Sequence, residues 1–125
     1  MPTHTYGTFT KALQAGKLEP AYYFLGAENV LKDEATTALL DRVLDPGLRD
    51  FNLDIRSAQQ LEPEDVLSLC TTLPMMADRR VVVVRDVEAW KRKTRGKKAV
   101  LEYLQKPIPE TLLVLVQGAA SEAKD

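Results

Sequence analysis

Four consecutive valines at positions 81–84 constrain the fold of this chain more than any other feature. A run of β-branched residues without alternating polar positions is typical of a strand buried on both faces, as in a parallel sheet covered by helices. Three other segments have strand composition, and four have the apolar spacing of helices. The predicted strands are residues 21–26, 51–56, 81–84 and 111–118, and the predicted helices are residues 8–15, 28–44, 63–73 and 98–105. Because helices and strands alternate, the sequence predicts an α/β fold, a three-layer αβα sandwich with a mostly parallel sheet.

Cap and turn residues set the expected limits of these segments. Thr8 is a candidate N-cap for the first helix. Pro63 opens the third helix, and Pro74 disfavours helix at Leu73, where we expect that helix to end. Residues 51–56 alternate in part between apolar and polar side chains, which predicts a half-exposed or edge strand.

Composition and charge limit the classes of function. The 125 residues suggest one domain, and a hydrophobic content of 45% is enough for a core at this length. The net charge of −1 provides no global field for nucleic acid or a membrane. The first ten residues lack the apolar region of a secretory signal, and the apolar runs are too short to span a bilayer. We therefore expect a cytoplasmic protein without membrane contact. Its single cysteine, Cys70, rules out an intramolecular disulfide framework and a paired-cysteine metal site.

The turn after the first predicted strand resembles part of a phosphate-binding loop. In α/β folds this turn often binds phosphate, and the Walker A pattern is G-x-x-x-x-G-K-[ST]. Gly26 and Lys32 have the required spacing, but Leu31 replaces the second glycine and Asp33 replaces the hydroxyl that binds magnesium. Arg85 also stands where the first acidic residue after the valine strand would be expected. We predict a degenerate site that binds no nucleotide or other cofactor, and an active P-loop NTPase is the alternative.

Two methionines follow the predicted third helix. Leu73 and Pro74 end that helix, and Met75 and Met76 fall in the connection to the valine strand. Connections run over the surface, so two large, adaptable apolar side chains there indicate a contact surface. Spacing alone leaves a second interpretation open, in which both methionines fold back into the core.

A dense basic segment follows the valine strand. Six of its eight residues are basic, namely Lys91, Arg92, Lys93, Arg95, Lys97 and Lys98. We expect a flexible, solvated loop, and a nucleic-acid-binding module or a contact with an acidic partner is the alternative. Trp90 beside this segment either stacks on a base or ties the loop to the core.

The remaining candidates for chemistry have structural explanations. Cys70 lies on the apolar face of the third helix, which indicates a buried, inert thiol. His4 has no visible partners for a catalytic triad. Glu62, Glu64 and Asp65 are typical of a helix start. We expect no catalytic activity.

The order of these features resembles the N-terminal domain of the delta subunit of bacterial DNA polymerase III, a clamp-loader component. The matching stretches are AYYFLGAENVLKDEA, FNLDIRSAQQLEPEDVLSLCTTLPMMADRRVVVVRDVE and LEYLQKPIPETLLVLVQG. The most specific part is residues 51–84, in which Phe-Asn precedes a helix, Thr-Leu-Pro, two large apolar residues and an Arg-Arg strand. The resemblance implies an AAA+-like P-loop NTPase fold with a degenerate nucleotide site. It also implies that residues 1–125 are one domain of a longer chain.

The resemblance implies partners as well. In the family, two adjacent apolar residues after this helix insert into a hydrophobic pocket on the sliding clamp, the beta subunit. Met75 and Met76 stand at those positions, after Leu73 and Pro74. The implied function is to bind the clamp and help open it during DNA replication. Other clamp-loader subunits would be contacted through missing C-terminal domains.

Overall fold

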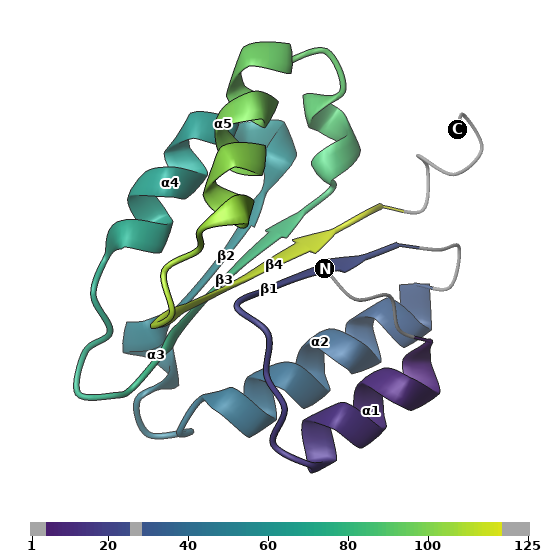
Figure 1. Ribbon diagram of the computed structural model, residues 1–125, viewed down its shortest axis with the longest axis vertical. Coiled ribbons are helices and arrows are strands. Elements are labelled where there is room, and N and C mark those ends of the chain that lie inside the picture. The colour runs from purple at the N-terminus through teal and green to yellow at the C-terminus, as the bar shows by residue number, and fades with distance from the viewer. Residues whose placement is uncertain (1–4, 26–28, 119–125) are drawn as a thin grey trace.

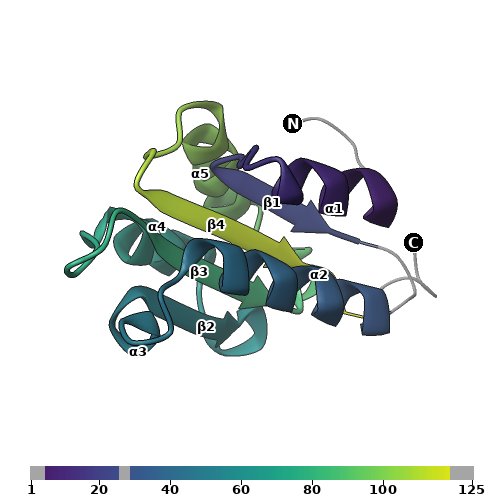
Figure 2. The same cartoon turned by 90° about the horizontal axis from the view of Figure 1, so that it is seen from below.

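The structure is a four-stranded parallel sheet between two layers of helices. The computed structural model describes residues 5–25 and 29–118. The strands lie in the order β1-β4-β3-β2, and all three neighbouring pairs are parallel. Figures 1 and 2 show α1 and α2 on one face of the sheet and α4 and α5 on the other. The elements are α1 (Tyr6–Gln14), β1 (Ala21–Phe24), α2 (Asn29–Val43), α3 (Arg49–Asn52), β2 (Leu53–Ser57), η1 (Ala58–Gln60), α4 (Pro63–Thr71), β3 (Arg80–Arg85), η2 (Val87–Trp90), α5 (Thr94–Gln105) and β4 (Thr111–Val116). The predicted αβα sandwich is therefore confirmed.

The valines of β3 account for this layered arrangement. All four are fully buried, because β3 is a central strand and helices cover both faces of the sheet. Val81 and Val83 pack in the core under α1 and α2, whereas Val82 and Val84 pack in the core under α4 and α5. Alternate side chains of a strand point to opposite faces, so one run supplies both cores. Full burial of a valine contributes roughly 1.5–3 kcal/mol.

Among the predicted boundaries that differ from the structure are the starts of α1 and β2. The first helix begins at Tyr6, and its cap is Thr5, whose hydroxyl accepts a hydrogen bond from the main-chain N–H of Thr8 at 3.2 Å. The strand predicted from residue 51 begins at Leu53, because Phe51 belongs to the short helix α3. The edge position predicted for this strand is confirmed, since β2 pairs only with β3 in the described sheet.

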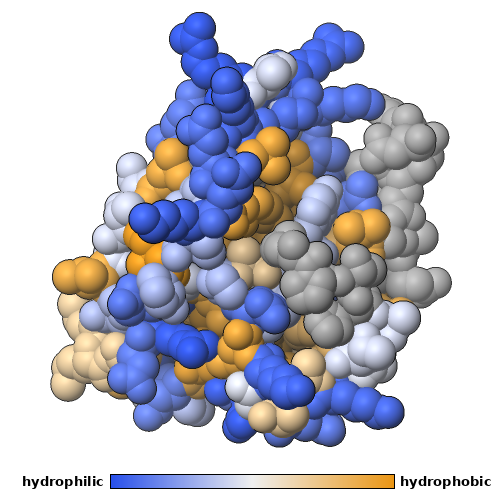
Figure 3. Space-filling model, in the orientation of Figure 1, coloured by the Kyte–Doolittle hydropathy of each residue, from blue (hydrophilic) through white to orange (hydrophobic). Residues whose placement is uncertain are grey.

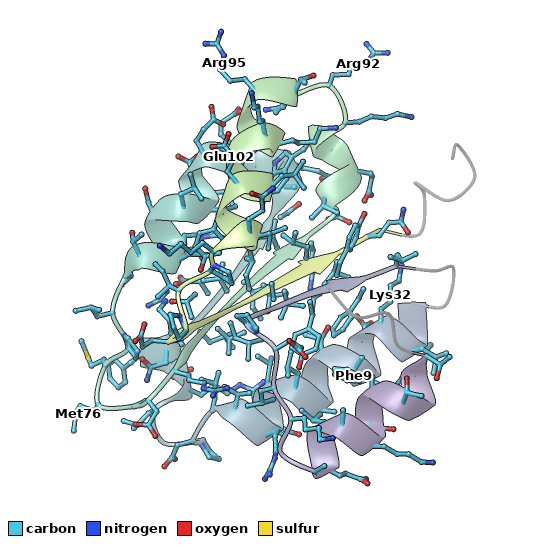
Figure 4. All side chains as sticks on the ribbon, in the orientation of Figure 1. Phe9, Lys32, Met76, Arg92, Arg95 and Glu102 are labelled. Carbon is cyan, nitrogen blue, oxygen red and sulfur yellow. The ribbon has the colours of Figure 1, made fainter. Side chains whose placement is uncertain are left out.

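Because the strands are parallel, they all begin at one side of the sheet, the amino edge, and all end at the opposite side, the carboxyl edge. The connection from α4 enters β3 at the amino edge, and the basic segment follows β3 at the carboxyl edge. Figure 4 shows the same separation, with Met76 at one end of the molecule and Arg92 and Arg95 at the other.

Candidate functional site

The connection between α4 and β3, residues 72–79, presents an apolar surface, and we call it the methionine loop. Leu73 is 79% exposed, Met75 54% and Met76 83%. Figure 4 shows Met76 at the lower left tip of the molecule, and Figure 3 shows apolar surface gathered at the same place. The alternative in which both methionines fold into the core is therefore wrong.

The helix before the loop ends slightly earlier than predicted. α4 stops at Thr71, and Thr72 is already extended, with φ −70° and ψ 131°. Because a proline disfavours helix at the residue before it, Pro74 explains the extended approach through Leu73. The loop therefore leaves the helix in an extended conformation that carries Leu73 into solvent.

The backbone at Met76 is in the left-handed region, with φ +56°. This conformation is uncommon for residues with a Cβ atom, and it costs free energy that the surrounding structure must offset. Such residues cluster at ligand-binding sites. The most exposed of the three large apolar side chains in the loop thus stands on a strained main chain.

Buried polar residues fix both halves of the loop. Asn52 is fully buried, accepts a hydrogen bond from the N–H of Met75 at 2.6 Å and donates one to its carbonyl at 2.9 Å. At the end of the loop, Arg80 is only 4% exposed and pairs with Asp54 on the neighbouring strand. Its main-chain N–H also donates to the carbonyl of Glu110 at 2.9 Å. The sequence alone assigned no role to Asn52, Asp54 or Arg80. Asn52 and Arg80 do belong to the Phe-Asn and Arg-Arg pairs on which the family resemblance depends.

The described part of the altered phosphate-binding turn, from residue 29 onward, lies at the carboxyl edge of the sheet. Gly26 lies outside the described residues. Lys32 is 5% exposed, and its ammonium donates a hydrogen bond to the main-chain carbonyl of Gln117 at 2.6 Å. Leu31 is 41% exposed, and Asp33 is exposed as well. The lysine therefore binds the end of β4.

Carboxylates also lie at this edge. Asp86 has a left-handed backbone, with φ +59°, and accepts a hydrogen bond from the Ser57 hydroxyl at 3.1 Å. Glu88 accepts one from the main-chain N–H of Gly118 at 2.9 Å. A Cβ atom at residue 118 would come within 2.7 Å of the Asp86 carboxylate, so both carboxylates lie close to the main chain of this residue. This crowding places negative charge beside the end of β4, where a phosphate would be repelled.

The basic segment is half helix rather than a continuous loop. α5 begins at Thr94, earlier than predicted, so the last basic residues lie in its first turns. Within α5, Gly96 packs so closely on α4 that a Cβ atom would come within 2.9 Å of Pro63. Trp90 is 3% exposed and donates from its indole to the carbonyl of Leu61 at 2.8 Å, which confirms that it ties this segment to the core.

Five of the six basic side chains are exposed, and Lys97 is intermediate. Figure 4 shows Arg92 and Arg95 pointing away from the molecule. Lys93 forms an ion pair with Glu62 at 2.6 Å, and Lys97 donates to the carbonyl of Lys91 at 2.9 Å. We call these six residues the basic surface.

The remaining candidates behave as structural groups. Cys70 is fully buried, and burial raises the pKa of its thiol to about 11. The carboxylate of Asp65 accepts from the N–H of Glu62 at 3.2 Å, which confirms the helix start. The described part of the chain contains no group of three or more His, Cys, Asp or Glu side chains that could hold a metal ion. Within the same part of the chain, each helix is too short or too polar to cross a membrane.

The fold defines an α/β domain of the AAA+-like class. The structure resembles a DNA polymerase III gamma subunit-related protein from Thermotoga maritima, with a TM-score of 0.66 over 90% of this chain and 40% of that one. The two sequences are 15% identical, so this likeness shows the fold alone. A second solved structure, the Bacillus subtilis DNA clamp loader delta protein, matches with a TM-score of 0.83 and 26% identity, over 90% of this chain and 35% of that one.

The sequence comparisons identify the family. The model of the family "DNA polymerase III, delta subunit" matches residues 22–124, and the chain therefore belongs to that family. It is 30% identical over 112 residues to DNA polymerase III subunit delta of Bacillus subtilis (strain 168). This match covers 85% of the chain and 32% of that relative, so the chain spans about a third of the relative's length. The resemblance inferred from the sequence is confirmed.

Proposed function

We propose that this chain is the clamp-binding domain of a clamp loader, which binds a sliding clamp and helps open it during DNA replication. The contact surface is Leu73, Pro74, Met75 and Met76. The observation that carries this proposal is the exposure of two adjacent methionines on a loop whose main chain is fixed by buried groups. Membership of the delta subunit family and the likeness to a clamp loader delta protein support it.

The proposed mechanism is mechanical and involves no bond chemistry in this chain. A partner shifts a conformational equilibrium only by its differential affinity for the two states. The methionine loop would therefore favour an open clamp by binding its pocket more tightly when the clamp interface is strained or separated. Contacts with other clamp-loader subunits would belong to the two thirds of the relatives that this chain does not match.

The test is the affinity of the chain for the sliding clamp of the same organism. Complete burial of a methionine contributes roughly 1.5–3 kcal/mol, and ordering each side chain opposes this by about 0.5–1.5 kcal/mol. Because Met75 is already half buried, replacing both methionines by alanine should remove about 1–3 kcal/mol, a 5- to 150-fold loss of affinity.

Leu101→Ala is the matched control, since Leu101 is 60% exposed on a different element, α5. It should leave the affinity unchanged, and all variants should melt within about 2 °C of the parent, because exposed side chains contribute little to the fold. Unchanged clamp affinity in the folded methionine variant would remove the loop as the docking site.

A second contact is favoured by the distribution of charge. The basic surface contains six of the 17 basic residues and none of the 18 acidic ones, so the rest of the chain has a net charge of −7. The first turn of α5 also contains no acidic residue, although the helix dipole favours one there. We infer that this concentration of positive charge contacts a DNA backbone within the complex.

Salt dependence tests the DNA contact. If the basic surface neutralises phosphates, the logarithm of DNA affinity should fall linearly with the logarithm of salt concentration. Replacing Arg92 and Arg95 by alanine should reduce that slope by roughly one to two units. An unchanged slope would mean that the basic surface is exposed to solvent and does not contact DNA.

A further inference from the structure

A buried asparagine lies directly behind the methionine loop. Asn52 is the last residue of α3 and is fully buried. Its amide oxygen accepts from the N–H of Met75, and its amide nitrogen donates to the carbonyls of Met75 and Leu48, at 2.9 and 3.2 Å. One side chain therefore satisfies both main-chain groups of Met75 and links them to the turn before α3.

This arrangement makes the position of the loop and the burial of the amide interdependent. A buried amide without partners costs roughly 1–3 kcal/mol, so the loop cannot leave Asn52 without that penalty. Met75 is 54% exposed, and its side chain gains no comparable anchor from the core. The main chain at the docking surface is therefore fixed by hydrogen bonds, while its apolar side chains stay in solvent.

We propose that Asn52 is a positioning residue for the docking surface: it holds the main chain of Met75 so that both methionines are presented before the clamp arrives. The proposal rests on the proposed function. Fixing a loop in its bound conformation strengthens binding, because less ordering remains to be done when the partner binds. Asn52 itself lies beneath the surface and does not need to touch the partner.

The test compares Asn52→Ala in two backgrounds. In the parent, it should weaken clamp binding by roughly tenfold, the effect expected when one or two side chains and their loop must be ordered on binding. In the Met75→Ala/Met76→Ala background, it should change the affinity by less than about twofold, because the side chains it positions are gone. Trp90→Phe removes another buried hydrogen bond near the opposite end of the molecule and should leave clamp affinity unchanged.

The outcomes separate the two proposals. Equal losses in both backgrounds, or no loss in the parent, would overturn the positioning role while leaving the methionines as the docking site. If the double methionine variant binds as tightly as the parent, the proposed function fails instead.

Hydrogen exchange on the unmodified chain keeps the proposal testable even where Asn52→Ala does not fold. The N–H of Met75 should exchange much more slowly than that of Met76, because only the former has a hydrogen bond to Asn52 in the structure. Equal exchange rates at the two residues would overturn the positioning role.

The exposure of the neighbouring phenylalanine supports a second inference, which also rests on the proposed function. Phe51 is 60% exposed, and it precedes the residue that bonds to Met75. Consecutive Cα atoms are about 3.8 Å apart, so the phenylalanine is carried close to the loop. Figures 1 and 2 show α3 beside the connection between α4 and β3. We infer that Phe51 extends the docking surface as a fourth large apolar contact beside Leu73, Met75 and Met76.

Phe51→Ala tests this extension with little risk to the fold, since most of the side chain is in solvent. Removing the aromatic ring should weaken clamp binding by at least about fivefold, because large aromatic side chains are frequent hot spots of interfaces. Leu101→Ala, equally exposed at 60%, is the control and should have no effect. A Phe51→Ala variant that binds as tightly as the control would restrict the docking surface to the loop.

Discussion

Replacing Met76 by glycine should stabilise the fold and weaken clamp binding at the same time. The residue has φ +56°, a conformation that glycine adopts without penalty and that a Cβ atom makes unfavourable. Its side chain is 83% exposed, so its removal takes little packing from the folded chain. If the side chain is retained for docking, fold stability and partner affinity must respond in opposite directions.

The two magnitudes follow from conformation and exposure. A left-handed backbone costs a residue with a Cβ atom roughly 1–2 kcal/mol, which glycine avoids. The greater flexibility of glycine in the unfolded chain lowers this gain in stability by about 0.5–1 kcal/mol. The net gain is about 1 kcal/mol, which raises the melting temperature by roughly 3–5 °C at this chain length. For binding, burial of the exposed part of Met76 less the ordering of its side chain leaves about 0.5–2 kcal/mol, a loss of roughly 2- to 30-fold.

Met76→Ala provides the matched comparison. Alanine removes nearly the same apolar surface but keeps the Cβ atom, so clamp binding should weaken similarly without a gain in melting temperature. Calorimetric melting and clamp titration of both variants measure the two effects. If glycine destabilises the fold relative to alanine, the left-handed backbone is not adopted in solution. If both variants retain parental affinity, the side chain is not a docking contact.

Four further results are expected. Titration with Mg-ATP should show no saturable heat at millimolar concentrations, and one-to-one binding that is lost in Lys32→Ala would restore the NTPase alternative. Alanine at residues 91–93 should leave the melting temperature nearly unchanged, because exposed charges contribute little; unfolding of this variant would make the segment structural. Asp54→Ala should cost roughly 3–5 kcal/mol in urea denaturation, because it leaves Arg80 buried without its partner, and a loss below 1 kcal/mol would contradict the assigned burial. Burial raises the pKa of the Cys70 thiol from 9.0 to about 11, so its ionisation opposes folding, and stability should fall as pH rises from 9 through 11, a component that Cys70→Ala should lack.

The layered fold could be predicted because its signal is local. Four buried valines in a row, flanked by segments with helical spacing, specify a strand covered on both faces. The αβα arrangement and the edge position of β2 follow from the same patterns. Boundaries were less accurate where two signals compete. Thr5 and Thr8 are both suitable caps, and only the path of the chain selects Thr5.

The fixed part of the site could not be predicted, because it depends on contacts between distant segments. Asn52 and Met75 are 23 residues apart, and Asp54 and Arg80 are 26 apart. A single sequence does not show that such residues meet. The exposure of the methionines was open for the same reason, since apolar residues in a connection pack inward or outward depending on what lies behind them. Here a polar side chain lies behind Met75 and gives its main chain an anchor without burying its side chain.

The two edges of the sheet separate the altered phosphate-binding turn from the proposed docking surface. In open α/β sheets, ligands bind beyond the carboxyl ends of the strands, and this chain has Lys32, Asp86 and Glu88 there. Their side chains form hydrogen bonds within the chain: the lysine binds the end of β4, and the carboxylates bind Ser57 and Gly118. The methionine loop lies at the amino edge, where substitutions at the carboxyl edge do not reach it directly. A lysine with motif spacing can therefore be retained for the stability of this edge, and its presence alone does not indicate nucleotide binding.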